Sequence, residues 1–73
     1  METVVAAGII RQIAQKMRDG TDVDTALRES SHGASRSVKD LVLERIHAAM
    51  PKVRTITPDA IGKAIMAAEA QLA

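Results

Sequence analysis

The segment from Ser30 to Pro51, SSHGASRSVKDLVLERIHAAMP, holds both the strongest helical pattern in the chain and its clearest interruption. Its second half repeats apolar residues at steps of three and four, which predicts an amphipathic helix that ends at Pro51. Its first half contains four serines and a glycine, which favour caps and turns over a helix interior. We therefore expect a helix break within residues 30–37, after which Ser35 or Ser37 caps the next helix.

Helical patterns also lie on both sides of this segment. Residues 2–18 repeat apolar side chains at helical spacing and precede Gly20, which can close a helix. Thr21 is a good N-cap for a second helix, and Thr57 followed by Pro58 is a strong start signal for a final one. The connection before Thr57 alternates apolar and polar residues, so it can lie extended, as one short strand paired across a dimer.

These patterns predict an all-α protein, a bundle of three or four helices in a single domain over residues 1–73. Its core is thin, because 13 of the 34 apolar residues are Ala, and Phe, Tyr, Trp and Cys are absent. In a chain this short, burial of 21 Val, Ile, Leu and Met side chains roughly balances the entropy lost on folding. We therefore expect an intertwined or face-packed homodimer. Its interface is expected to use the stripes of the third and last helices, with Val38, Leu41, Val42, Ile46, Ile61 and Ile65.

Charge and composition disfavour several classes of protein. The formal net charge is +1, without the strong basic excess typical of nucleic-acid binders. No stretch reaches the roughly 18 apolar residues of a membrane span, and the start METVV lacks the positive region of a signal peptide. We expect a cytoplasmic protein without membrane contact. Two His, no Cys and only scattered glycines suggest no disulfide, metal site or cofactor.

Catalytic chemistry has one candidate, the run Ser30, Ser31 and His32, because a hydrolase needs a Ser next to a His. Adjacent residues point in different directions, so a polar turn is the simpler interpretation. A core this small also leaves little room for a substrate pocket. We expect a protein that is not an enzyme.

Four basic residues are candidates for binding nucleic acid. Lys52 and Arg54 lie in the connection before the last helix, which can present both to phosphate. Arg36 and Lys39 lie near the start of the third helix, where the helix N-terminus also attracts anions. The alternative is that these residues are solvated charges without a specific role.

Residues 54–65, RTITPDAIGKAI, resemble the last loop and helix of the histone fold. The resemblance extends in outline to the whole chain, with a first helix, a central region of about the right length and this ending. It implies an obligate handshake dimer that binds the DNA backbone through paired loops. Those loops would carry Arg18 together with Lys52 and Arg54.

Residues 32–46, HGASRSVKDLVLERI, are similar to the start of the second helix in ribbon-helix-helix repressors. There, a Gly and a Ser-Arg-Ser cap lead into a helix whose N-terminus holds a DNA phosphate. The resemblance implies phosphate contacts for Ser35, Arg36 and Ser37.

Both resemblances point to DNA, and they favour a small homodimeric DNA-binding protein, regulatory or architectural. The alternative is a protein-binding module, such as an adaptor or inhibitor, that docks an apolar helix face on a larger partner. The near-neutral charge favours this alternative.

Overall fold

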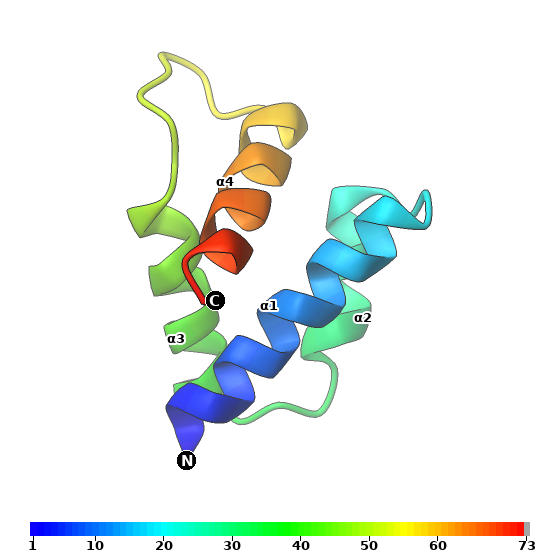
Figure 1. Cartoon of the computed structure of the whole chain (residues 1–73), viewed down its shortest axis with the longest axis vertical. Coiled ribbons are helices and arrows are strands. Elements are labelled where there is room, and N and C mark those ends of the chain that lie inside the picture. The colour runs from blue at the N-terminus through cyan, green and yellow to red at the C-terminus, as the bar shows by residue number, and fades with distance from the viewer. Residues whose placement is uncertain (73) are drawn as a thin grey trace.

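The computed structural model describes residues 1–72, which form four α-helices (Figure 1). The helices are α1 (Glu2–Arg18), α2 (Val23–Ser31), α3 (Arg36–Ala48) and α4 (Pro58–Ala70). No strand forms among the described residues, so the connection from α3 to α4 is an irregular loop in the single chain. The prediction of a small all-α bundle is confirmed.

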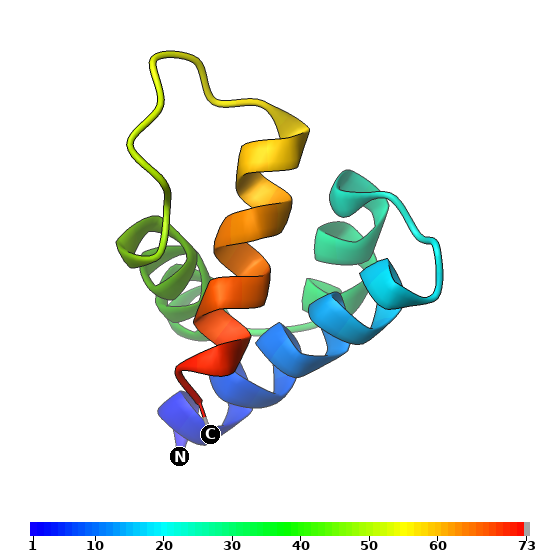
Figure 2. The same cartoon turned by 45° about the horizontal axis from the view of Figure 1, so that its top comes forward.

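The first helix is central, because α1 packs against each of the other three. Its apolar residues lie at helical spacing on one face, where Ile10 and Ile13 have no exposed surface. In both views α3 and α2 lie on opposite sides of the picture, and α1 crosses between them (Figures 1 and 2). Val42 of α3 and Ile65 of α4 complete the fully buried centre. The core therefore forms where three helices meet α1.

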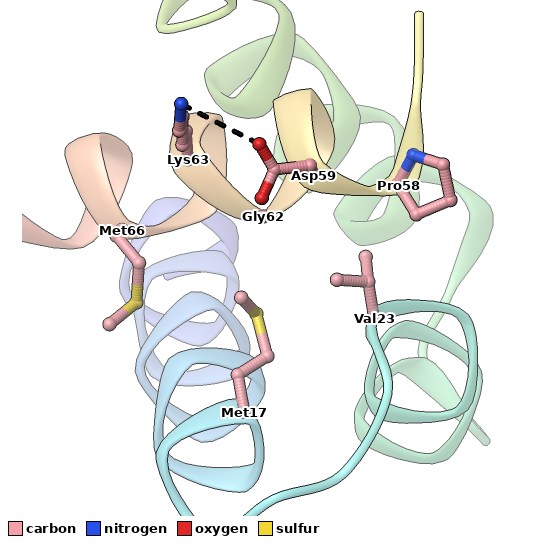
Figure 3. A pocket seen from close by; sticks show the side chains of 7 residues that line it. All are labelled: Met17, Val23, Pro58, Asp59, Gly62, Lys63 and Met66. Carbon is pink, nitrogen blue, oxygen red and sulfur yellow. Dashed lines mark ion pairs between the residues drawn. The ribbon is translucent and has the colours of Figure 1, made fainter.

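The last helix approaches the end of α1 and the start of α2 closely at Gly62, which has no side chain. A Cβ added at Gly62 would lie 3.2 Å from Met17 Cε and 3.4 Å from Val23 Cγ2. Figure 3 shows both of these side chains extending towards Gly62. Ala60, Ala64 and Ala68 are also buried, on a different side of α4 from Gly62. The small residues of α4 thus serve packing within the chain.

Hydroxyl caps begin two of the helices. Ser35 Oγ accepts a hydrogen bond from the backbone N–H of Val38 at 3.3 Å, so Ser35, rather than Ser37, caps α3. Thr57 Oγ1 accepts from the backbone N–H of Ala60 at 3.2 Å, as the sequence predicts. Each cap satisfies a backbone donor that has no partner inside its helix.

The predicted cap of α2 was wrong by one residue, because Asp22 and not Thr21 begins the helix. Asp22 has an extended backbone, and its Oδ2 accepts from the backbone N–H and the hydroxyl of Thr25 at 3.0 and 2.9 Å. A carboxylate at this position also meets the positive end of the helix dipole, which a threonine hydroxyl does not exploit. The two bonds from Thr25 hold the pKa of Asp22 below its usual range.

A four-residue turn, residues 32–35, joins α2 to α3, and its Gly33 has a φ of +80°. Glycine adopts this left-handed backbone without the steric strain that a Cβ introduces. The predicted break within residues 30–37 is therefore confirmed. The preceding Ser30 is not part of the turn: it lies buried in the last turn of α2, and its hydroxyl has no hydrogen-bond partner among the described residues.

Replacing Gly33 with Ala should lower the free energy of unfolding by about 1 kcal/mol, because Ala is strained at positive φ. Gly8→Ala is the matched control, since Gly8 lies inside α1 with no atom within 4 Å of an added Cβ. There the same change should raise the free energy of unfolding by about 0.5 to 1 kcal/mol. Thermal unfolding followed by circular dichroism measures both variants. A higher melting temperature for Gly33→Ala would contradict the left-handed turn.

Candidate functional site

The basic residues predicted to bind nucleic acid do not form one patch. Arg36 and Lys39 are exposed in the first turn of α3, whereas Lys52 and Arg54 are exposed in the loop beyond its other end. A helix of 13 residues is about 20 Å long, so α3 separates the two pairs by roughly its own length. Both pairs lie on the surface, and at this separation solvent and salt screen the electrostatic potential of one pair from the other. The two pairs therefore act as separate basic sites.

The fifth basic residue, Arg18, is engaged within the chain. Its guanidinium donates to both carboxylate oxygens of Glu69, at 2.8 and 2.9 Å, and so ties the end of α1 to the last turn of α4. The hydrogen bond from Arg18 holds the pKa of Glu69 below its usual range, and Glu69 in turn raises the pKa of Arg18. The pair occupies two of the five N–H donors of the guanidinium and neutralises its charge. A phosphate would therefore have to compete with Glu69 for Arg18.

The side chains predicted for a dimer interface are mostly used inside the chain's own core. They belong to the stripes that α3 and α4 turn towards α1. A homodimer of this fold therefore has to use other surfaces. Of the six predicted residues, four are buried, namely Val38, Val42, Ile46 and Ile65, and Leu41 and Ile61 are half-buried.

The outer side of α3 forms a groove centred on Leu43, whose surface is 50% exposed. Three adjoining depressions all include this side chain in their walls. The three depressions adjoin one another at Leu43 and are together called the Leu43 groove. Its lining comprises Asp24, Leu27, Arg28 and Ser31 from α2, Arg36, Lys39, Asp40, Val42, Leu43, Ile46 and His47 from α3, and Met50, Ile56 and Ile61 beyond it.

The groove exists because α2 and α3 scarcely pack against each other. Each packs against α1 instead, so the space between them stays open to solvent. Leu27 of α2 and Val42 of α3 line that space. Along the rim, α3 places Lys39, Leu43 and His47 at steps of four, which puts all three on one face of the helix.

The section of the groove beyond Leu43 is almost wholly apolar. It encloses about 170 Å³, and His47 is the only polar side chain in its walls. Ile56 reaches it from the loop between α3 and α4 and remains 59% exposed. Apolar side chains from α2, α3, α4 and the loop before α4 thus meet at one small concave site.

A second depression, of about 360 Å³, lies where the end of α1 meets the starts of α2 and α4 (Figure 3). It is lined mainly by apolar side chains, among them Met17 and Val23. Its titratable residues, Asp59 and Lys63, form a surface ion pair at 3.5 Å, so neither is free to act on a substrate. Within residues 1–72, no three His, Asp or Glu side chains are placed to hold a metal ion, and no helix could cross a membrane.

Leu43 was not among the predicted site residues, although the sequence holds a signal for it. Leu41, Val42 and Leu43 are three consecutive apolar residues, and consecutive positions on a helix are about 100° apart. One face cannot bury all three, so one of them has to remain at the surface. Which one is exposed depends on how α3 is rotated against α1, and this follows from packing rather than from local pattern.

Replacing Glu69 with Gln should lower the melting temperature at neutral pH, because it removes the carboxylate that binds Arg18. The folded pKa of Glu69 is depressed, so the pair stabilises the fold above the unfolded pKa, and the effect disappears as pH falls through the folded pKa. The difference between wild type and variant should therefore shrink as the pH falls from about 5 through the folded pKa of Glu69. Thermal unfolding across this range measures it, with the exposed Glu44→Gln as control. A difference that does not change with pH would contradict the role of the pair.

Comparisons with protein-family models, curated proteins and solved structures find no match to this chain. With no relative to supply a function, the shape and chemistry of its surface have to indicate one. The Leu43 groove is the surface feature that combines concave shape with exposed large apolar side chains.

Proposed function

We propose that this chain is a small non-enzymatic module that binds a partner protein in the Leu43 groove. Leu43 and Ile56 carry the proposal, because both are large apolar side chains left exposed in one concave surface. Full burial of such a side chain is worth about 1.5 to 3 kcal/mol. A chain with so thin a core gives up much stabilisation by leaving two of them in solvent, and a bound partner would restore it.

The shape of the groove supports docking of protein side chains over binding of a small molecule. Its apolar section has a volume of only about 170 Å³, and the adjoining depressions of about 360 and 410 Å³ are open to solvent, whereas ligand pockets bury most of a ligand's surface. The apolar section is large enough for one or two apolar side chains of a partner. Such anchors, fully desolvated in a pocket, supply most of the affinity in protein interfaces.

Leu43→Asp should abolish binding of the partner, because it places a charge in the centre of the apolar contact. The fold should be unaffected, since Leu43 is half-exposed. Val4→Asp is the matched control, as Val4 is 70% exposed on α1 and does not line the groove. Affinity capture from extracts of the source cell, with each tagged variant, tests this. A partner that the wild type and both variants retain equally would exclude the groove as its binding site.

A homodimeric DNA-binding function is the second candidate, and it is supported by the connection between α2 and α3. Two helices joined by a four-residue turn with a glycine have the layout of a helix-turn-helix motif, whose second helix enters the major groove. Arg36 and Lys39 would then face DNA from the exposed start of α3. A histone fold spans this region with one long helix, whereas the turn at Gly33 divides it into α2 and α3. The support for DNA binding therefore comes from α3 and not from a histone-like layout.

The DNA function predicts a salt signature, because phosphate contacts release counterions. Each basic side chain that binds phosphate should flatten the slope of log affinity against log salt by about 0.9 when it is replaced by Ala. If α3 contacts the DNA backbone, Arg36→Ala should flatten the slope. If the loop between α3 and α4 contacts it, the double replacement Lys52→Ala and Arg54→Ala should flatten the slope instead. Fluorescence anisotropy on a labelled duplex, with light scattering for the oligomeric state, measures both. Absence of any duplex binding at about 50 mM salt would exclude the DNA function.

A further inference from the structure

We infer that the occupant of the Leu43 groove is an acidic amphipathic helix of a partner protein. This inference rests on the proposed docking function and adds the chemical class of the partner. It follows from three features, which are the length of the groove, its apolar section, and the basic residues that line its start and occupy the loop beyond its other end.

The length of the groove fits a helix of the partner. From Arg36 to Ala48 it follows the whole of α3, 13 residues or about 20 Å, which equals nearly four turns of a second helix. Lys39 and Leu43 lie four residues apart on the surface of α3, and Met50 follows seven residues after Leu43, just past the end of the helix. A partner helix laid along this row would present its own apolar residues at the same spacing.

The end of the groove at the start of α3 is basic. Arg36 and Lys39 both line it, and Asp40 is the one acidic residue in that depression. On the α2 side, Asp24 already has a cation of its own chain, since Arg28 lies 3.8 Å from its carboxylate. This end therefore keeps an excess of positive charge for an acidic partner.

Basic residues also lie close in sequence to the opposite end of the groove. Lys52 and Arg54 are exposed in the loop that supplies Ile56 to the apolar section, although they do not line that section themselves. The chain has no acidic residue between Glu44 and Asp59, so nothing nearby in the loop neutralises them. A helix with acidic residues at both ends and apolar residues between them matches this order of charge along the groove.

Two other occupants fit the groove less well. A DNA backbone matches the basic ends, but its phosphates cannot be desolvated against the apolar section between Leu43 and Ile56. A second copy of this chain has exposed large apolar residues in α1, where Glu2 is the only acidic residue, and around its own Leu43 groove, where the neighbouring basic residues are the same and repel. Neither combines an apolar row with acidic flanks.

Two labelled helical peptides of 18 residues test the inference. Both carry Leu at every third or fourth position, so that the Leu side chains form one apolar row. At the other positions near the two ends, the first peptide carries Glu and the second carries Lys. Fluorescence anisotropy with the whole chain, at about 50 and about 200 mM salt, should detect the acidic peptide and give at least tenfold weaker binding of the basic one. Leu43→Asp should reduce binding of the acidic peptide at least tenfold.

Charge-reversal variants locate the electrostatic part of the interaction. Lys39→Glu and Arg54→Glu should each weaken the acidic peptide several-fold, and the weakening should be larger at low salt. Arg45→Glu is the matched control: it makes the same charge change on α3, but Arg45 is exposed about 200° around the helix from Leu43. Equal weakening in Arg45→Glu and Lys39→Glu would show an effect of net charge only and overturn the inference.

The remaining outcomes separate this inference from the docking function. If both peptides bind equally and depend on Leu43, the docking function stands and the acidic partner is excluded. A further outcome is that neither peptide binds at about 1 mM, but the wild type captures a partner from the cell extract and Leu43→Asp does not. In that case the groove binds something other than an acidic helix. A labelled duplex that binds and is weakened by Lys39→Glu, with no binding of either peptide, would favour the DNA function instead.

Discussion

Ile10 and Ile13 occupy the one region of this bundle where side chains from all four helices can meet. They have no exposed surface, and the helix that carries them packs against each of the others. Because the chain has no aromatic residue, no single large side chain can fill the centre. Branched and small side chains pack around α1 instead, and each of the other helices depends on that packing for its position.

This dependence on one helix explains the surface as well as the core. Since α2 and α3 are each stabilised by α1, they need not pack against each other, and a groove remains between them. Where the end of α1 meets α4, Gly62 permits a close approach, and a Cβ there would lie 3.2 Å from Met17 Cε. The same thin set of apolar residues therefore produces a tightly packed face and an open one.

Local signals in the sequence were enough to place the helices, and contacts distant in sequence were needed to identify the site. Gly33, Ser35 and Thr57 act through neighbours within three residues, so their roles could be read from the sequence. The exposure of Leu43 depends on how α3 rotates against α1. The engagement of Arg18 likewise depends on Glu69, 51 positions away, which no spacing rule relates to it. The choice between neighbouring caps, Thr21 or Asp22, was also beyond the local pattern.

The loop between α3 and α4 swings out from the bundle in both views (Figures 1 and 2). Residues 51–56 make no backbone hydrogen bonds within the described part of the chain. Their amide hydrogens should therefore exchange with solvent almost as fast as in an unfolded peptide, and a protease with access to Lys52 or Arg54 would cut here first. A nicked chain would keep α4 through its side-chain packing against α1, α2 and α3 and through the Arg18–Glu69 pair. The resistance of Lys52 and Arg54 to trypsin is thus a direct measure of whether a partner covers this edge of the groove.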